Sequence, residues 1–328
     1  MKRVLLPLTG LTALAIVCAV VACSGGEQAD VGVTEPMVVS GAQFLAGAMP
    51  GAPPVEDGGA GDDGGAGATA PLSVVSVDYN NLHVVPGAAG KSFGGLATTD
   101  AVAVGVRLED LGSGYWVVPV AGRDNQVPNT SDFSFSASFD VNDPPGERNL
   151  LMVAIDASGN AGTQLATELC LESRIPDNGH ACDPEAPVPA VVISLQWDDN
   201  FDVDLDVITP DGTDVNPKTN PLAVPIDSGV PPAGDPRIDR DSLGQCVPDG
   251  LRQEDLVFAD YPATGPYDIY AAPFASCGQP TVRFVLTIYE AGSDGALHAT
   301  FTQAGELLAS SQTGGGSSGL FVTEKQFN

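Results

Sequence analysis

The sequence predicts an all-β protein in which two β-sandwich domains in tandem follow a disordered N-terminal tether. From about residue 71 onward, short apolar runs alternate with polar residues. A period of two places alternate side chains on opposite faces of a strand. Turn-forming residues such as Pro144-Pro145-Gly146 separate these runs. Beyond the N-terminal segment, the sequence has no long stretch with helical periodicity.

The first 22 residues have the layout of a secretory signal. Lys2 and Arg3 precede an almost wholly apolar run that ends at Ala22, directly before Cys23. This order resembles the bacterial lipobox, and the resemblance implies that residues 1–22 are removed and that Cys23 becomes the lipid-bearing N-terminus. An uncleaved membrane anchor is the alternative, because the apolar run is long enough to span a bilayer. The residues after Cys23, however, supply neither an aromatic belt nor a basic flank.

The lipobox resemblance also implies a location in the bacterial cell envelope. Ser24 stands where an aspartate favours retention in the inner membrane of enteric bacteria, which favours the outer membrane here. Residues 23–70 contain few large apolar side chains and include the run 58–65, which consists almost entirely of Gly and Asp. Such a composition cannot bury enough surface to fold. We therefore expect residues 23–70 to form a lipidated, flexible acidic tether.

The overall charge limits the partners. The formal net charge is −29 at pH 7, and loss of Lys2 and Arg3 with the signal would make it more negative. Such a chain repels phosphate backbones, which excludes nucleic acid, and it lacks the polybasic patch that binds anionic lipid. The predicted partners are therefore the membrane, through lipid at Cys23, and an envelope polysaccharide or surface protein. A strongly negative surface can also attract cations.

The four remaining cysteines predict two disulfides, as is usual for an even set in an exported chain. Three connectivities are possible for Cys170, Cys182, Cys246 and Cys277. We expect the local pairs, Cys170–Cys182 and Cys246–Cys277. Zinc is the rival interpretation, but the sequence offers no CxxC motif and no nearby histidine pair.

Residues 71–168 are predicted to form the first sandwich. Their apolar residues alternate with small or polar ones and end in the turn Asp156-Ala157-Ser158-Gly159-Asn160. This closing strand and turn resemble those of bacterial immunoglobulin-like modules, which implies a sandwich of about 100 residues that serves as a spacer or adhesive unit. The residues expected on common strand faces are Val102, Val104, Val106 and Leu108; Phe133, Phe135 and Phe139; and Leu151, Val153 and Ile155.

A disulfide-stapled junction, 169–189, is expected to precede the second sandwich, 190–328. This domain opens with an apolar strand ending at Trp197, followed by an acidic strand in which Asp202, Asp204 and Asp206 alternate with apolar residues. The three carboxylates share one face at a spacing of about 7 Å. Such a row of like charges requires neutralisation or solvent.

The second sandwich resembles the YfaP-type bacterial domain of unknown function. The motifs that carry the resemblance are the acidic strand after Trp197, Asp239-Arg240-Asp241, Glu254, and the stretch 265–270. The resemblance implies a jelly-roll-like sandwich, distantly similar to pre-peptidase C-terminal domains. The family often carries His where this chain has Asp206, which makes this site more acidic.

Two interpretations of the acidic residues remain open. They form either a solvated outer face or a Ca²⁺ site, because calcium takes six to eight oxygen ligands. Convergence requires that the two Asp-x-Asp segments be neighbours. The candidate ligands are Asp202, Asp204, Asp239, Asp241 and Glu254.

The sequence gives weak catalytic signals. His83, His180 and His298 are scattered, and none stands in a metal-ligand or nucleophile motif. We therefore expect a non-catalytic envelope lipoprotein that acts as a tethered binding or structural module, with no certain cofactor and Ca²⁺ as a candidate. The alternative is an accessory carbohydrate- or peptidoglycan-binding subunit of a hydrolase, or a glycosidase that uses paired carboxylates.

Overall fold

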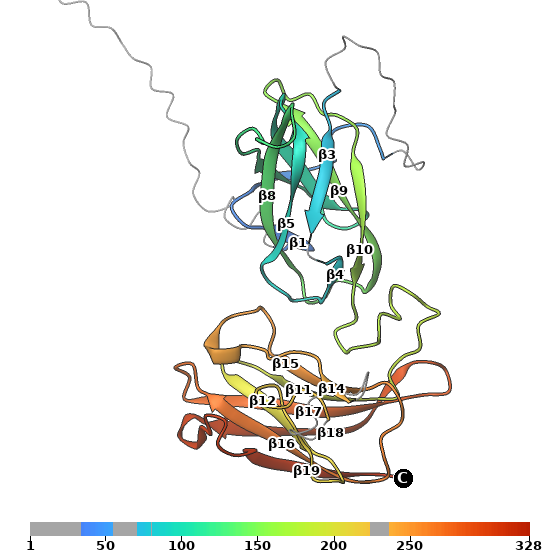
Figure 1. Cartoon of the computed structure of the whole chain (residues 1–328), viewed down its shortest axis with the longest axis vertical. Helices are drawn as coiled ribbons and strands as arrows, with labels where there is room; N and C mark the ends of the chain where they lie inside the picture. Colours follow the sequence, from blue (N-terminus) through green and yellow to red (C-terminus); the bar gives the residue numbers. More distant parts are fainter. Residues whose placement is uncertain (1–33, 55–70, 80, 224–235) are drawn as a thin grey trace, which may run out of the picture.

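The computed structural model describes residues 34–54, 71–79, 81–223 and 236–328. Figure 1 shows two β-sandwiches stacked along the long axis of the molecule. In the described residues, the helical structure consists of two short 3₁₀ turns, Gly244–Cys246 and Ala309–Ser311. This part of the chain contains no helix that is long and apolar enough to cross a bilayer. The predicted all-β fold with two sandwiches is confirmed.

The first sandwich packs a four-stranded sheet against a six-stranded sheet. Phe133 and Phe135 lie on one face of β8 and are buried against Val104 and Val106 from the opposite sheet, as their alternation predicts. In sheet order, the strands are β1 (Met37–Val39), β8 (Thr130–Phe139), β5 (Lys91–Thr98) and β3 (Val74–Tyr79), facing β2 (Gln43–Ala46), β7 (Gly114–Pro119), β6 (Ala101–Leu108), β9 (Gly146–Asp156), β10 (Leu165–Leu171) and β4 (His83–Val84).

The prediction that residues 23–70 form a tether is wrong for the part that the structure describes. β1 extends the first sheet beside β8, and β2 extends the second beside β7. Met49 then packs against Leu151 and Val153 on the outer face of β9. A few apolar residues are enough to form these two strands, because each strand pairs with the edge of a sheet that the rest of the sandwich supplies. The first sandwich therefore includes residues 34–54, while Cys23 and residues 1–33 and 55–70 lie outside the described residues.

One strand phase also differs from its prediction. A β-bulge between Ala101 and Ala103 shifts the register of β6. Val102 is consequently half exposed, whereas Ala101 and Ala103 are buried. The extra residue of a bulge rotates the side chains on one side of it. From Val104 onward, the predicted phase holds.

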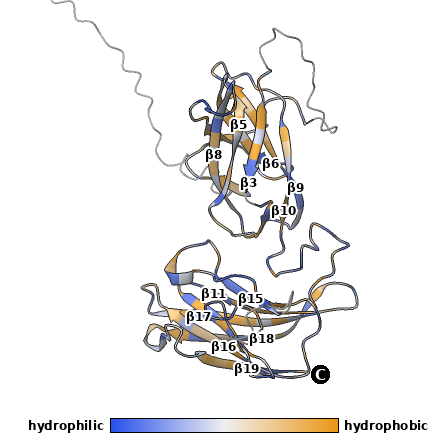
Figure 2. Ribbon diagram, in the orientation of Figure 1, coloured by the Kyte–Doolittle hydropathy of each residue, from blue (hydrophilic) through white to orange (hydrophobic). Residues whose placement is uncertain are grey.

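The second sandwich packs a five-stranded sheet against a four-stranded one. Leu195 and Leu286 from the first face Leu205 and Ile269 from the second in a single core. Figure 2 shows the hydrophobic residues concentrated in the strands of both sandwiches. In sheet order, the strands are β14 (Arg237–Ile238), β15 (Gln253–Phe258), β11 (Val191–Trp197), β17 (Thr281–Ala291) and β18 (Leu297–Leu308), facing β13 (Asp214–Val215), β12 (Asp202–Ile208), β16 (Gly265–Ala275) and β19 (Leu320–Phe327).

Both predicted disulfides are confirmed. Cys170–Cys182 joins β10 to the junction, with Cα atoms 5.7 Å apart. Cys246–Cys277 joins the first 3₁₀ turn to the loop between β16 and β17, with Cα atoms 5.4 Å apart. Because β10 continues to Leu171, the first sandwich ends after the predicted limit at residue 168.

The junction also links the two sandwiches. The Arg174 guanidinium donates to Gln253 Oε1 at 3.2 Å, and Gln253 Nε2 donates to the Arg174 carbonyl at 2.9 Å. A loop of the first sandwich adds a further contact, because the Ala89 amide donates to the Asp249 carbonyl at 3.1 Å. These bonds connect the first sandwich and the junction to β15 and to the loop that precedes it.

Candidate functional site on the acidic strand

The carboxylates of β12 are buried, so the interpretation as a solvated outer face is wrong. Asp202, Asp204 and Asp206 are 0%, 3% and 6% exposed, although they lie on the face of β12 opposite to the core residues. The turn after β13 and the loop 313–318 cover this face and line a cavity over it. Period-two spacing identified the face correctly but carried no information about what covers it.

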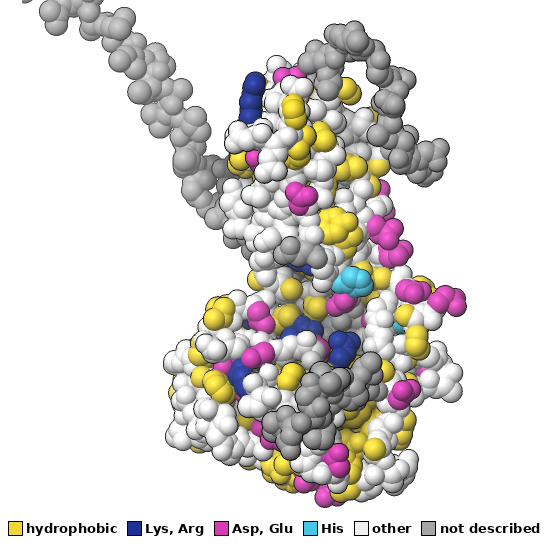
Figure 3. Space-filling model, in the orientation of Figure 1, with side chains coloured by type: hydrophobic (Ala, Val, Ile, Leu, Met, Phe, Trp, Pro, Cys, Tyr) yellow, Lys and Arg dark blue, Asp and Glu magenta, His cyan; other side chains and the backbone are white. Residues whose placement is uncertain are grey.

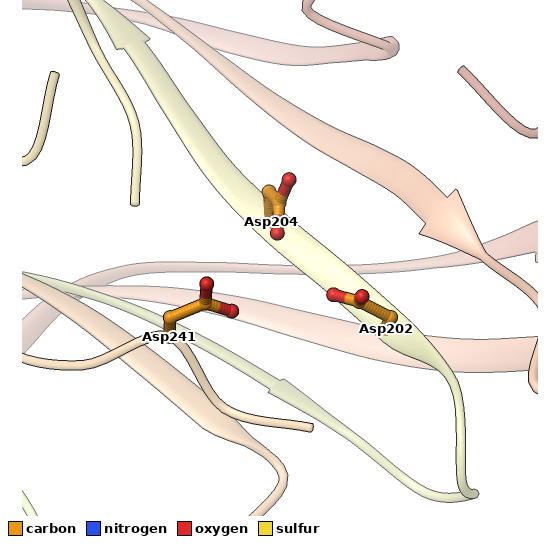
Figure 4. A group of neighbouring side chains, drawn as sticks. All are labelled: Asp202, Asp204 and Asp241. Atoms are coloured by element: carbon orange, nitrogen blue, oxygen red, sulfur yellow. The ribbon is translucent and has the colours of Figure 1, made fainter. Parts of the chain in front are cut away.

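Lys218 lies at the centre of three of these carboxylates. Its Nζ atom is 3.1 Å from Asp202 Oδ1 and 3.2 Å from Asp204 Oδ1, and it donates a short hydrogen bond to Asp241 Oδ1. The ammonium also lies 4.8 Å from the centroid of the Phe274 ring, within the range of a cation–π contact. Figure 4 shows the three carboxylates converging from β12 and from the loop after β14. The chain's own cation thus occupies the position predicted for calcium.

A short turn positions Lys218. Asn216 Oδ1 accepts hydrogen bonds from the Lys218 amide at 3.1 Å and from the Thr219 amide at 2.9 Å. The Asn216 amide in turn donates to the Asn220 carbonyl at 2.9 Å. An asparagine side chain that accepts from the amide two residues later is a recurrent turn device. The turn places Lys218 over the open side of β12.

Asp241 is positioned by the loop that carries the first 3₁₀ turn. A Cβ atom on Gly244 would lie 2.6 Å from Asp241 Oδ1, so the carboxylate fits only against a glycine. The next residue, Gln245, donates its amide to Asp202 Oδ2 at 2.7 Å. The Cys246–Cys277 disulfide ties this loop to the end of β16. One covalently fastened loop therefore supplies the third carboxylate and a backbone donor.

Glu254 lies between the two sheets and is fully buried. Its carboxylate accepts the Leu205 amide at 2.8 Å and the Ser242 amide at 3.2 Å. β13 pairs with β12 only at Val207 and Ile208, so Leu205 lies beyond that pairing and uses Glu254 as its acceptor. Glu254 therefore lies near the predicted ligands, but its carboxylate accepts backbone amides, one of them from the part of β12 that β13 does not pair.

Asp239 does not join the cluster. Its Oδ2 atom accepts from Arg240 Nε at 2.6 Å, and its Oδ1 atom accepts from the Asp255 amide at 2.9 Å. The prediction assumed that Asp239 and Asp241 share one face, as residues two apart do in a strand. β14 ends at Ile238, however, and the chain then turns, so the two side chains reach different surroundings.

The cluster holds more negative than positive charge. Burial raises the pKa of Asp204 to about 7, with Lys218 opposing this rise and Asp202 adding to it. Burial also raises the pKa of Glu254, and the charge of Asp204 raises it further. Burial alone would lower the pKa of Lys218, but its contacts with the three carboxylates raise it above its ordinary value. One ammonium therefore neutralises only part of the site.

Asp206 lies at the other end of the row, away from Lys218. Burial raises its pKa to about 8, and the charges of Asp214 and Asp204 contribute to the shift. It lines a cavity of about 170 Å³ together with Asp204, Asp214, Asn216 and the loop 313–318. The sequence analysis named Asp206 but left it out of the metal set, and it missed Asp214, Asn216 and Lys218. A single sequence gives no signal that brings the turn 216–220 over β12.

The described histidines have partners of their own. His83 contacts Glu172 at 3.0 Å, and His298 contacts Asp294 at 2.9 Å. His180 Nδ1 lies 2.7 Å from the Ala186 carbonyl oxygen. All three lie away from the acidic strand. The chemistry that the arrangement on β12 supports is the binding of a cation, either the ammonium of Lys218 or an ion.

Comparison with known proteins gives little further information. Neither a family model nor a curated protein matches the chain. Among solved structures, one described as manganese lipoxygenase of Gaeumannomyces graminis with partial zonadhesin of Komagataella pastoris is 12% identical, covers 74% of this chain and 95% of its own, and has a TM-score of 0.20. A γ-CGTase from an alkalophilic Bacillus clarkii is 8% identical, covers 74% of this chain and 26% of its own, and has a TM-score of 0.21. Such similarity is too weak to indicate a function.

Proposed function

We propose that the chain is a non-catalytic lipoprotein of the bacterial cell envelope, in which lipid at Cys23 anchors two β-sandwiches that act as a structural or binding module. The observation that carries the proposal is the pairing of buried carboxylates of the acidic strand with Lys218 of the same chain. Asp202 has no exposed surface, and both of its carboxylate oxygens contact groups of the same chain. The most unusual chemistry of the chain is thus used to hold its second sandwich together.

The burial of these groups argues against a glycosidase. A general acid or base must come within hydrogen-bond distance of a proton on the substrate. Asp202 and Asp204 instead face Lys218 beneath a covering turn. Figure 3 shows acidic side chains spread over the visible face of both sandwiches, as expected for a module whose outer surface is solvated rather than shaped around one substrate.

Metabolic labelling tests the anchor. Cells that express the chain with its own signal are fed a palmitate analogue, and the native chain is compared with a Cys23→Ser variant. We expect label on the native chain and none on the variant. Equal labelling of both chains, or none on the native chain, would refute the lipid anchor. Protease treatment of intact and lysed cells then distinguishes surface display from a periplasmic location.

The binding role is tested separately. Purified native chain is passed over immobilised cell-wall and matrix polysaccharides, with the labelled Cys23→Ser variant as a second sample. Retention of both samples by one polysaccharide supports a binding module of the envelope. Passage of both through every matrix favours the structural version of the proposal. The partner predicted from the sequence, a polysaccharide or a surface protein, stays a prediction.

A further inference from the structure

Asp206 is a buried carboxylate on the covered face of β12. It is 6% exposed, and the described part of the chain donates no hydrogen bond to it; its surroundings affect its charge only through burial and the carboxylates of Asp214 and Asp204. Buried side-chain oxygens normally have a partner in the protein or in ordered water. Among the described residues, the cation that contacts this row is Lys218, and its ion pairs are with Asp202, Asp204 and Asp241. Asp206 therefore forms no ion pair with a described residue.

A cavity of about 170 Å³ lies beside Asp206. Asp204, Asp206 and Asp214 line it together with Lys218 and residues of the loop 313–318. The buried Asp204 Oδ1 lies 3.2 Å from Lys218 Nζ, an ammonium that Asp204 shares with Asp202 and Asp241. The volume exceeds that of one water molecule several-fold, so the cavity has room for an ion with some of its water ligands.

We propose that this cavity is a binding site for a hard divalent cation, Ca²⁺, held by the carboxylates of Asp206 and Asp214 with Asp204 beside them. The site differs from the calcium site predicted from the sequence, whose position Lys218 takes. It also goes beyond the proposed envelope function, because it depends neither on lipid nor on a macromolecular partner.

The ligand chemistry favours calcium over other metals. Three of the four charged residues that line the cavity, Asp204, Asp206 and Asp214, carry carboxylates, which suit hard cations, and the fourth is Lys218. Among the described residues, the lining includes neither a thiolate nor an imidazole, the ligands that zinc prefers. Calcium accepts irregular geometry with six to eight oxygens, whereas magnesium requires a near-ideal octahedron. Protein carboxylates together with cavity water meet the calcium requirement. Asp206, which accepts no hydrogen bond from the described residues, would thereby obtain a partner.

Isothermal titration with CaCl₂ tests the site. The full chain in detergent is first freed of metal with a chelator, and Asp206→Asn is compared with Asp268→Asn, which carries the same change on the neighbouring strand β16, outside the cavity. We expect the native chain to bind with a Kd of roughly 10⁻⁴–10⁻³ M, as extracellular calcium modules do. The Asp206→Asn variant should bind at least tenfold more weakly, and Asp268→Asn should bind like the native chain.

Three results would overturn the proposal: no binding by the native chain, unchanged binding by Asp206→Asn, or loss of binding on Asp241→Asn alone. The last result would place the ion at the carboxylates that contact Lys218. Circular dichroism in chelator establishes that each variant is folded. If Asp206→Asn does not fold, Asp214→Asn takes its place, because Asp214 lies at the less buried wall of the same cavity. The labelling of Cys23 is a separate readout, so failure here leaves the envelope proposal unaffected.

Discussion

The Nζ atom of Lys218 lies 3.1 Å from Oδ1 of Asp202, a carboxylate that has no exposed surface. Lys218 lies in the turn that follows β13, and Asp202 is the first residue of β12, so the ion pair links these two segments. Removing one partner of a buried pair leaves the other as an uncompensated charge in a medium of low dielectric. We therefore expect the stability of the second sandwich to depend on Lys218.

Replacing Lys218 should destabilise the second sandwich strongly. In Lys218→Met, the carboxylates of Asp202, Asp204 and Asp241 lose the ammonium that contacts all three. A loss of about 3–5 kcal/mol in the free energy of unfolding is expected for a broken buried pair. Urea unfolding at neutral pH in chelator measures it. Lys325→Met is the matched control, because its pair with Glu290 is partly exposed and should contribute at most about 1 kcal/mol. Equal losses in the two variants would contradict this prediction.

Lys218→Met should also allow Ca²⁺ to bind at the carboxylates that the sequence analysis named as candidate ligands. Oxygen atoms of Asp202, Asp204 and Asp241 lie within 4.8 Å of one another, a spacing that one ion can bridge. Without the ammonium between them, these carboxylates are available to Ca²⁺. We expect calcium to raise the unfolding midpoint of Lys218→Met by more than it raises that of the native chain, because binding to the folded state alone is stabilising. The experiment is repeated with Asp241→Asn added, which should remove the excess; an excess that persists would place the ion elsewhere.

The features that could be predicted from the sequence depend on local pattern. The alternation around Phe133 and before Trp197 identified the core faces, because a strand has a strict period of two. The cysteine pairs followed from the short separations between their members. The convergence of Asp202 and Asp204 with Asp241 belongs to one of the two interpretations that the Asp-x-Asp motifs left open, and that interpretation also included Asp239, which lies elsewhere.

The remaining features depend on long-range packing. Lys218 lies 16 residues after Asp202, and only the turn at Asn216 brings the two together. Asp239 and Asp241 have different surroundings because β14 ends at Ile238, before both residues, so they do not share one face of a strand. β1 pairs with β8, about 100 residues later in the chain, so its three residues carry little signal of their own. The local sequence around each residue therefore gives no indication of these long-range contacts.

Gly244 should be intolerant of a side chain. A Cβ atom there would lie 2.6 Å from Asp241 Oδ1 and 2.9 Å from Asp241 Cγ, so Gly244→Ala must displace the carboxylate from Lys218. We expect a loss of about 1–3 kcal/mol, the usual size for a broken buried network. Thermal unfolding measures it. Gly122→Ala serves as control, because a Cβ on Gly122 has no atom within 4 Å and should leave the midpoint nearly unchanged. Equal midpoints for the two variants would show that Asp241 can move at no cost.

Stability should fall as the pH rises from about 4 to about 8 when divalent cations are absent. The raised pKa values, about 7 for Asp204 and about 8 for Asp206, mean that the folded chain keeps protons which an unfolded aspartate loses near pH 4. In this window the native state binds more protons than the unfolded state, so the free energy of unfolding decreases with pH. Below the window both states are protonated at these groups, and their contribution no longer changes.

Asp206→Asn isolates the contribution of one group to this slope. The asparagine cannot ionise beside Asp204 and Asp214, so the variant should be more stable than the native chain at pH 8.5 and nearly equal to it near pH 4. A gain of 1 kcal/mol would raise the unfolding midpoint by roughly 2–4 °C for a unit of about 150–250 residues. Calorimetry in chelator at both pH values measures the difference, with Asp268→Asn as the control that should follow the native curve. A native chain whose midpoint rises steadily from pH 5 to pH 8.5 would contradict the burial of unpaired acid on β12.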